Sequence, residues 1–588
     1  MNLYKHIEQI VKNELNAIPE IAEFLQDHGK DIVVEVPKNR DFGDFATNAA
    51  MVLSRPMKSN PRAIAEIIVK KLSEVPEIKK CEIAGPGFIN ITIAPSLWDK
   101  LLGYVVAEKD NYGSSDFGKN QKINVEFLSA NPTGPIHVGH TRGAIFGDVL
   151  SRLLAKIGYN VTKEYYINDF GQQVGVLARS VMWRYEELFD RHKEDTFPEG
   201  AYPGEYVIPV AQKIKSKDGD KWLDKPESDW LDYFKQIAVN DMMDIIRANL
   251  ADLGIYFDVF TSEKSLVDSK QVDKVLKVMK SKGLVYEGTL PKPLGEDIKD
   301  WTPEVQLLFK ATEFGDDVDR VVARSNGVTT YFTSDIAYHL DKYQRGFKEQ
   351  IDIWGADHGG YIKRIKSALS SVTDGKASLE VKLYQIVNLE KDGKPFRMSK
   401  RAGNFVLVGD ILDEIESDAF RLFMITKSAD SQMTFDLAKA KEQSKDNPVF
   451  YIQYAHARAN SVLKKFAETF GSEADTSSSE DFYASSSEIE QNLIKSIADY
   501  PSIIEASAKS RSPQVLSSYL EELSRQFHSL WTVGAKEGIR FIDADNKALS
   551  QKRMLLVTAL KNTIANGLKT IGVVPKEVME NLNTPPEE

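Results

Sequence analysis

A single cysteine, Cys81, occurs among the 588 residues of the chain. One thiol excludes a disulfide framework and a zinc site built from paired cysteines, and it fits a reducing compartment. Apolar runs such as 101–107 are far shorter than a membrane span. The opening stretch, M-N-L-Y-K-H-I-E-Q-I, has no apolar signal-peptide core. We therefore expect a cytoplasmic protein that makes no use of a membrane.

The chain also lacks an excess of positive charge. Its 75 Lys and Arg against 86 Asp and Glu give a formal net charge of −11. This balance argues against a general nucleic-acid coat, so any RNA contact must come from local basic patches. With 42% hydrophobic and 27% charged residues, the composition is that of an ordinary globular protein. A chain of this length predicts about three or four domains.

The most informative stretch is Val125–Gly143. The apolar run 123–128 predicts a buried strand, turn-forming residues at 131–135 end it, and helical spacing follows from Val138. A helix that opens in this way presents free backbone N–H groups and the positive end of its dipole. His137 and His140 are three residues apart and would face one side of that opening, while Gly139 lets a flat ligand approach the backbone. The stretch predicts a nucleotide cradle.

Two other interpretations of the histidines remain open at this point. An H-x-x-H pair could be half of a zinc site, but the chain has one cysteine and no carboxylate in the H-E-x-x-H position. Either histidine alone could be a core residue that has its hydrogen bonds satisfied, although the surrounding turn residues argue against this. We expect no protein-bound metal.

The motif H-V-G-H at His137–His140 resembles the HIGH signature of class I aminoacyl-tRNA synthetases. The longer run S-A-N-P-T-G-P-I-H-V-G-H-T-R-G-A resembles its arginyl-tRNA synthetase version. The resemblance implies ATP-dependent activation of L-arginine to arginyl-adenylate, transfer to the 3′ end of tRNA(Arg), and release of AMP and diphosphate. Mg²⁺ would be carried with ATP as substrate. His137 and His140 would be catalytic and, with Gly139, would bind ATP.

Two further stretches complete the expected ATP site. The strand-like run before Gly355 ends in G-A-D-H, where the glycine admits a ribose and Asp357 accepts from its hydroxyls; a helix cap by Asp357 is the alternative. The run F-R-M-S-K-R-A-G-N at 396–404 resembles the KMSKS loop, which implies ATP binding by Met398, Ser399 and Lys400, with Lys400 catalytic. The loop departs from that motif at Arg397 and Arg401. We expect Lys400 to converge with the two imidazoles on the triphosphate.

The amino-acid pocket can be tested on physical grounds. A guanidinium is planar, presents forked donors and calls for carboxylates. The resemblance nominates Glu126 and Asp335 for this role, Tyr331 as a wall, and Asn131 for the α-amino group; Ser129 and His140 complete the expected set. Glu126 lies within a largely apolar strand, where a lone buried carboxylate would be unfavourable. The alternative is that it faces a solvated cleft without a partner. A strand that leads into a helix is predicted at 331–335.

The expected fold is α/β, with a Rossmann-like parallel-sheet catalytic domain between an N-terminal α+β domain and a C-terminal all-α bundle. The boundaries are 1–117, 118–445 with a surface insertion at 190–235, and 446–588. A helical pattern spans 3–25, and leucine stripes around 516–530 and 556–568 predict bundle helices. The run S-D-A-F-R at 417–421 resembles the D-A-L-R element at the exit from the catalytic part.

The two outer domains are expected to bind tRNA. The N-terminal domain resembles the arginyl-tRNA synthetase module that contacts the corner of the tRNA, with Phe42 in a patch of cations and aromatics. Near the start of the bundle, Tyr451, Tyr454 and Arg458 combine rings and a cation that suit single-stranded bases. A surface turn and core aromatics are the respective alternatives. Family likeness favours a monomer.

Two rival functions remain on sequence grounds. One is a small-molecule nucleotidyl ligase of the same nucleotide fold, which would use no tRNA and would leave the outer domains unexplained. The other is a non-catalytic RNA-binding regulator derived from a synthetase, against which the intact His137, His140, Asp357 and Lys400 argue.

Overall fold

The computed structural model describes residues 2–37, 39–192, 196–290, 304–391, 393–396, 406–442, 444, 446–476, 481–536 and 538–579. The chain divides into two compact units. Unit 1 comprises Met1–Ser115, Gln443–Ser510 and Val515–Glu588, and unit 2 comprises Asp116–Glu442 and Arg511–Gln514. Within the described ranges, no helix combines the length and the apolarity needed to span a membrane.

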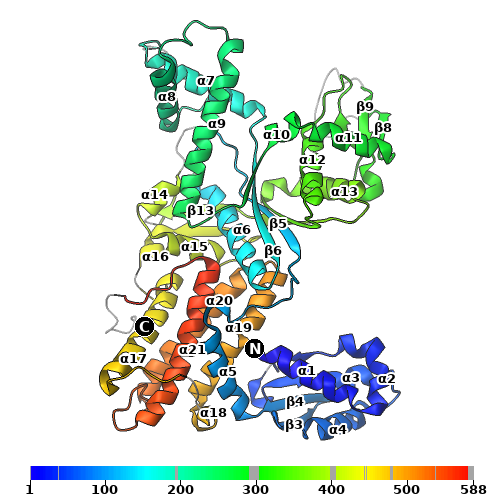
Figure 1. Cartoon of the computed structure of the whole chain (residues 1–588), viewed down its shortest axis with the longest axis vertical. Coiled ribbons are helices and arrows are strands. Elements are labelled where there is room, and N and C mark those ends of the chain that lie inside the picture. The colour runs from blue at the N-terminus through cyan, green and yellow to red at the C-terminus, as the bar shows by residue number, and fades with distance from the viewer. Residues whose placement is uncertain are drawn as a thin grey trace. The chain divides into compact units, whose positions relative to one another are not determined.

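A five-stranded parallel sheet organises unit 2 (Figure 1). Its strands, in the spatial order β12-β11-β5-β6-β7, are Ser378–Tyr384, Glu349–Gly355, Lys122–Phe127, Asn160–Ile167 and Val259–Ser262. The chain extends from β5 through β6 to β7 on one side, and then adds β11 and β12 on the other. Strand order therefore reverses between β5 and β11, and a ligand crevice is expected outside the carboxyl ends of these two strands.

Helix α6, Val138–Lys156, lies on one face of this sheet, in the place that the sequence predicted. A Cβ atom on Gly147 would come within 2.2 Å of Phe127 Cγ, and one on Gly143 within 2.5 Å of the Tyr384 ring. The two glycines thus allow the helix to pack directly on β5 and on the end of β12. Successive strand side chains alternate between faces. Glu126 consequently faces the other side, where it contacts α12, Tyr331–Gln344.

The predicted surface insertion is largely helical. It contains α8, Ile208–Asp218, and the start of α9, Glu227–Asp252, which pack with α7, Gln172–Glu187 (Figure 1). Their shared core includes Tyr185 and Phe234. The Pro and Gly residues of this segment made helices hard to predict from its composition. Many of them lie at helix ends, as Gly219 does at the C-cap of α8.

The segment 331–335 is helical from its first residue, so the predicted strand there is wrong. Helix α12 begins at Tyr331 and buries Phe332, Ile336 and Leu340, spaced four apart, in a core shared with α11 and α13. This packing outweighs the strand-like aromatic and β-branched composition. The neighbouring elements are α10 Glu263–Asp268, α11 Gln271–Ser281, α13 Ile362–Val372, and the antiparallel strands β8 Val285–Gly288, β9 Gln306–Phe309 and β10 Arg320–Ala323.

The last part of unit 2 combines short helices with a second small sheet. Strand β13 pairs antiparallel with β14 and parallel with β15. The elements are β13 Val387–Lys391, β14 Lys394–Phe396, α14 Val408–Leu412, α15 Ser417–Ile425, β15 Met433–Asp436 and α16 Leu437–Lys441. The D-A-L-R-like run forms the start of α15.

Unit 1 begins with helices around an antiparallel sheet of order β1-β2-β4-β3. The predicted helix 3–25 is two helices, because Pro19 starts a new one. The strand β2 follows Phe42 closely, in the patch for which a surface turn was the alternative prediction. The elements are α1 Leu3–Asn16, α2 Pro19–His28, β1 Val34–Glu35, β2 Phe45–Thr47, α3 Ala49–Ser54, α4 Pro61–Leu72, β3 Ile78–Ala84 and β4 Phe88–Ile93.

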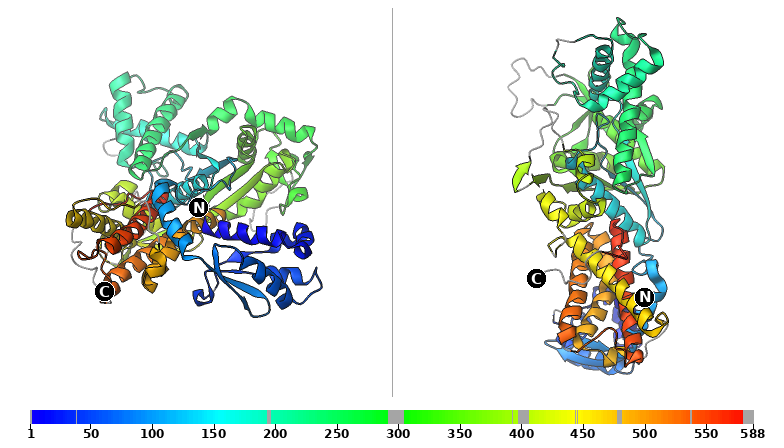
Figure 2. Two further views of the ribbon diagram at one scale, coloured as in Figure 1. Left: turned by 60° about the horizontal axis from the view of Figure 1, so that its bottom comes forward. Right: turned by 90° about the vertical axis from the view of Figure 1, so that its left-hand side faces the viewer.

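The rest of unit 1 is helical, and its long helices run side by side (Figures 1 and 2). The leucines of both predicted stripes are fully or almost fully buried. The helices are α5 Pro95–Glu108, α17 Pro448–Phe470, α18 Phe482–Ser485, α19 Glu488–Lys509, α20 Gln514–Lys536 and α21 Lys547–Ile571. The expected fold class is therefore confirmed: a parallel-sheet nucleotide fold, an N-terminal α+β part and a C-terminal helical bundle.

Candidate active site

The two signature histidines lie together at the opening of α6. His137 occupies the N-cap position in an extended conformation, and the helix begins at the next residue. The imidazole rings of His137 and His140 stack with their centroids 3.7 Å apart. Both rings therefore share one side of the helix opening, as the spacing predicted, next to the positive end of the helix dipole.

The segment 406–408 lies against the same opening. Leu407 forms an antiparallel bridge with His137. The amide of Val138 donates to Val406 O at 3.1 Å, and the amide of Val408 donates to Ile136 O at 3.1 Å. These residues directly follow the KMSKS-like loop in the sequence. The loop residues themselves, Arg397, Met398, Ser399, Lys400 and Arg401, lie outside the described residues.

The turn that leaves β5 is held in an unusual conformation. Leu128 and Ser129 have φ values of 68° and 38°, a left-handed region that L-residues seldom occupy and that is typical of functional sites. Ser129 Oγ donates to Glu126 Oε1 at 3.0 Å and accepts from the amide of Tyr166 at 3.0 Å. Asn131 is exposed, and its side-chain amide donates to Gln173 Oε1 at 2.8 Å.

The predicted ribose element lies at the carboxyl end of β11. Asp357 is exposed, and a Cβ atom on Gly355 would come within 2.5 Å of its Oδ1 atom. The alternative role as a helix cap is not supported, because α13 begins only at Ile362 and no side-chain cap bond is formed there. The exposed carboxylate is therefore available to accept hydrogen bonds from a ligand at the strand-order switch.

Asp335 lies on α12, one turn after Tyr331, whose side chain is 63% exposed. The hydroxyl of Tyr361 donates to Asp335 Oδ2. Burial raises the pKa of Asp335 to about 7 although this hydrogen bond lowers it, and the negative charges of Glu263 and Glu126 raise it further. Asp335 thus belongs to a group of buried carboxylates that repel one another.

Glu263 is a site residue that the sequence did not reveal. It is the first residue of α10, directly after β7, and it is 3% exposed. Burial and the charge of Asp169 raise the pKa of Glu263 to about 7. Within the described part of the chain it has neither a hydrogen-bond nor an ion-pair partner. The available signal was its position: a carboxylate directly after a strand, at the edge where such sheets bind ligands.

Two buried tyrosines line the same space. The rings of Tyr166 and Tyr338 are 4.5 Å apart, and among the described residues neither hydroxyl has a hydrogen-bond partner. Burial raises the pKa of Tyr166, and so do the charges of four nearby carboxylates, Glu263, Asp335, Glu126 and Asp169. These hydroxyls lie beside carboxylates whose charge is not compensated. Such a pocket suits a cation that has several hydrogen-bond donors.

Glu126 has a partner within the protein. The alternative prediction, in which Glu126 faces a solvated cleft without a partner, is therefore wrong. Its Oε2 atom lies 2.6 Å from Lys342 Nζ, and both side chains are buried.

Among the described residues, no group of three or more His, Cys, Asp or Glu is arranged to hold a metal ion.

The predicted RNA contacts of the bundle need correction. Tyr454 and Arg458 are 2% and 4% exposed, and the Arg458 guanidinium donates to the Tyr454 hydroxyl and lies over the Trp531 ring. Because both side chains pack inside the bundle, their burial argues against direct contact with RNA. Tyr451 is half-buried against His528. In the N-terminal part, Phe42 is 60% exposed and remains a predicted contact.

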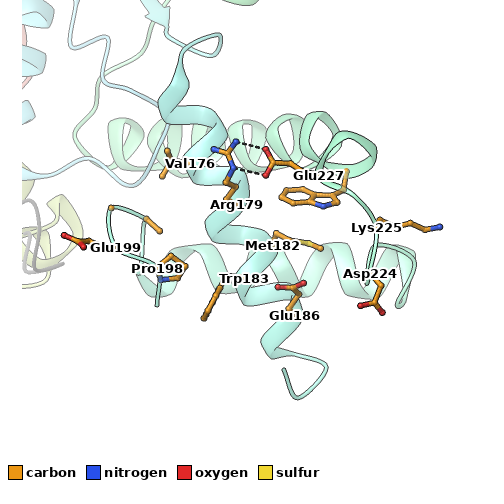
Figure 3. Close-up of a pocket in the computed structure, with 13 residues that line it drawn as sticks. Val176, Arg179, Met182, Trp183, Glu186, Pro198, Glu199, Asp224, Lys225 and Glu227 are labelled. Atoms are coloured by element: carbon orange, nitrogen blue, oxygen red, sulfur yellow. Dashed lines mark hydrogen bonds and ion pairs between the residues drawn. The ribbon is translucent and has the colours of Figure 1, made fainter. Parts of the chain in front are cut away.

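A pocket of about 650 Å³ lies in the helical insertion, between α7, α9 and residues 198–201 (Figure 3). Its walls include Trp183 and Trp230. The Arg179 guanidinium donates two hydrogen bonds to Glu227, at 2.6 and 3.1 Å. Asp224 and Glu186 are also paired within the protein. Four of its charged side chains are therefore already paired within the protein, and we do not place the reaction there.

Family models match most of the chain. Residues 102–461 match the model described as tRNA synthetases class I (R), catalytic domain. Residues 5–93 match the Arginyl tRNA synthetase N terminal domain, and residues 452–579 match the DALR anticodon binding domain. The three matches follow one another along the chain in the order that the resemblance implies.

Curated relatives match over almost the full length. The arginine–tRNA ligase of Ruegeria pomeroyi is 45% identical over 587 residues, 98% of this chain and 100% of that protein. That of Roseobacter denitrificans is 46% identical over 583 residues, with the same shares. The structure of Thermus thermophilus arginyl-tRNA synthetase matches with a TM-score of 0.70 at 19% identity, over 98% of this chain and 100% of that one, which shows the fold. The chain therefore belongs to the arginyl-tRNA synthetase family of class I aminoacyl-tRNA synthetases.

Proposed function

We propose that this arginine–tRNA ligase binds the guanidinium group of its amino acid between Asp335 and Glu263. The observation that carries the proposal is a pair of carboxylates at the carboxyl edge of the sheet, Glu263 buried and Asp335 half-buried, with raised pKa values and no cation of the protein paired with Glu263 among the described residues. A guanidinium cation presents five donors in one plane and can satisfy both carboxylates and the Tyr166 hydroxyl.

Glu126, which the sequence nominated for the guanidinium, is paired with Lys342 at 2.6 Å, and we therefore assign that role to Glu263 instead. The other arginine contacts follow the sequence expectation. Tyr331 forms a wall on the turn of α12 before Asp335. Asn131 binds the α-amino group, and His140 lies near the carboxylate that reacts. Glu126 and Ser129 border the pocket at the end of β5, where they are bonded to each other. Each of these residues lies on β5, α6 or α12, or on the turns beside them.

ATP binds across the strand-order switch. His137, Gly139 and His140 contact its phosphates at the opening of α6, and Gly355 and Asp357 hold its ribose. Met398, Ser399 and Lys400 complete the site, and Lys400 stabilises the charge that develops on the phosphates. The bridge between His137 and Leu407, seven residues after Lys400, supports this assignment. The arginine carboxylate attacks the α-phosphate, diphosphate leaves, and the adenylate then transfers its acyl group to the terminal ribose of tRNA.

The protein contributes position and charge to this reaction rather than a covalent intermediate. Mg²⁺ enters with ATP. We further propose that the enzyme is a cytoplasmic monomer, as family likeness and the single cysteine favour. Phe42 and Tyr451 remain proposed tRNA contacts. The family matches at 5–93 and 452–579 account for the two modules that a ligase of small molecules would leave unexplained.

Citrulline tests the guanidinium assignment, because it has the shape of arginine but carries a neutral ureido group. We expect the inhibition constant of citrulline to be at least about 100-fold larger than the KM for arginine. The reason is that the two carboxylates of the pocket would have to accept a neutral ligand. The measurement is the inhibition constant of citrulline in ATP–pyrophosphate exchange with tRNA present. Comparable binding of citrulline and arginine would show that these carboxylates do not meet the side chain.

The pKa values of the pocket also predict a pH dependence. Burial raises the pKa of Asp335 and of Glu263 to about 7 in the free protein. Arginine binds the ionised carboxylates, so below that pH its binding must release the protons they hold. The KM for arginine should therefore fall as the pH rises from about 6 to about 8, and then level off. The KM for ATP, measured in the same series, is the comparison. A KM for arginine that stays constant over this range would contradict the prediction.

A further inference from the structure

A row of buried carboxylates crosses the three central strands beneath the proposed arginine pocket. Glu164 on β6, Glu126 on β5 and Asp352 on β11 occupy matching register positions, so they lie side by side on one face of the sheet. All three are 7% exposed or less. Three neighbouring charges in a buried environment are strongly unfavourable unless cations compensate them.

Helix α12 supplies the compensating side chains. His339, Lys342 and Arg345 are spaced three residues apart and face the sheet. The guanidinium of Arg345 donates to both oxygens of Glu164, at 2.8 and 2.9 Å. Asn124 Nδ2 donates to Glu164 Oε2 at 2.6 Å. Arg345 is therefore the direct ion-pair partner of Glu164, while burial alone would raise the pKa of Glu164 and the charges of Lys342 and Arg345 hold it below its ordinary value.

Asp352 has a second neighbour besides Lys342. The side-chain amide nitrogen of Gln350 donates to two backbone carbonyls, including that of His339 at 3.0 Å, so Gln350 Oε1 must be the atom that accepts from His339 Nδ1 at 2.8 Å. The other ring nitrogen, Nε2, faces Asp352 Oδ2 at 3.4 Å. Burial and the charge of Lys342 lower the pKa of His339 to about 4, so the imidazole is neutral and Lys342 is the cation that contacts Asp352 among the described residues.

Lys342 is the remaining cation, and it contacts both Glu126 and Asp352, with Glu126 the closer of the two. It is fully buried, with Nζ 2.6 Å from Glu126 Oε2, 3.2 Å from Asp352 Oδ1 and 4.3 Å from the centroid of the Tyr338 ring. Burial alone would lower the pKa of Lys342, but Asp352 and Glu126 raise it to about 12, so the ammonium stays charged. Its closest contact is the carboxylate whose other oxygen accepts from Ser129.

These contacts connect Lys342 to the turn at Leu128 and Ser129, which follows β5. Lys342 holds Glu126, Glu126 holds Ser129, and Ser129 is one of the two left-handed residues that lead towards His137. We propose that Lys342 is a positioning residue for amino-acid activation: its buried ammonium fixes Glu126 as a brace for the Ser129 turn, and leaves Asp335 and Glu263 as the uncompensated carboxylates that meet arginine. This inference rests on the proposed arginine pocket.

The experiment compares Lys342→Met with Lys342→Arg, each in the native background and in Glu126→Gln. We expect K342M to raise the KM for arginine at least about tenfold and to leave the KM for ATP within about threefold. K342R should keep the KM for arginine within about fivefold of the parent enzyme, because it retains the charge. In E126Q, the K342M change should add less than about threefold, because the carboxylate through which Lys342 acts on Ser129 is gone.

The readouts separate positioning from mere stability. A purely structural role for Lys342 would lower Tm and the active fraction, and hence kcat, but would leave the KM for arginine unchanged; that result overturns the proposal. An equal rise in KM with and without Glu126 overturns it as well. If K342M does not fold, the comparison of K342M/E126Q with E126Q decides: equal KM values support the proposal, and a further tenfold rise overturns it. Failure of the pocket itself would show separately, as an unchanged KM for arginine in Asp335→Asn.

Discussion

Replacing Asp335 with asparagine should raise the KM for arginine by about 30- to 5,000-fold, which corresponds to about 2–5 kcal/mol for breaking a buried charge pair. The substitution keeps the shape of the side chain and an oxygen for the Tyr361 hydroxyl, but it removes the negative charge. The bound guanidinium would then be left with a neutral partner on one side. The measurement is ATP–pyrophosphate exchange in the presence of tRNA, at about pH 8, where Asp335 is ionised.

Glu313→Gln is a matched control, since it removes an exposed carboxylate of the same unit and should leave the KM for arginine unchanged. The KM for ATP should change little in Asp335→Asn, because the proposed ribose and phosphate contacts lie at the end of β11 and at the start of α6. If Asp335→Asn activates arginine with an unaltered KM, Asp335 is not part of the pocket.

Replacing Asp148 with alanine should lower the free energy of unfolding of unit 2 by about 3–5 kcal/mol, the range for removing one partner of a buried ion pair. Asp148 on α6 is fully buried, and its Oδ2 atom lies 2.6 Å from Arg421 Nη2. Arg421, in the D-A-L-R-like run, is 1% exposed and also donates to Leu253 O at 2.7 Å. Without Asp148 the guanidinium would remain buried but would lose the carboxylate that compensates its charge. Urea denaturation followed by circular dichroism measures the loss.

The double variant Asp148→Leu/Arg421→Met is the informative comparison, because exchanging a whole buried pair for apolar side chains is often close to neutral. Burial alone would raise the pKa of Asp148, but Arg421, Arg152 and Lys163 hold it below its ordinary value. The stabilisation is therefore complete above about pH 4 and is lost as the pH falls further. A loss in Asp148→Ala no larger than in the double variant would contradict the expected cost of burying the Arg421 charge without the Asp148 carboxylate.

The parts of the ATP site that form within short segments were predictable from sequence. The strand 123–128, the turn residues after it and the helix from Val138 follow from periodicity and turn chemistry over about 20 residues. The stacking of His137 on His140 follows from their spacing at a helix opening. The same holds for Gly355 and Asp357, which end a strand.

Predictions from residue patterns failed where the same residue types suit two different structural environments. The ring-and-cation pattern of Tyr454 and Arg458 suits RNA and also suits a packed bundle, and the structure buries both side chains. The aromatic and β-branched start of α12 suits a strand, but packing of its i, i+4 apolar residues makes it a helix.

The sequence by itself determined the order of the three parts, the nucleotide-binding segments and the family, because those signals are local or lie in contiguous motifs. Only the tertiary structure decided which charges compensate one another. Lys342 meets Glu126 across 216 residues, and Glu263 joins Asp335 only because the end of β7 and the start of α12 lie at one edge of the sheet. Electrostatic energy depends on distance and burial, and neither quantity is written in the order of residues along a chain.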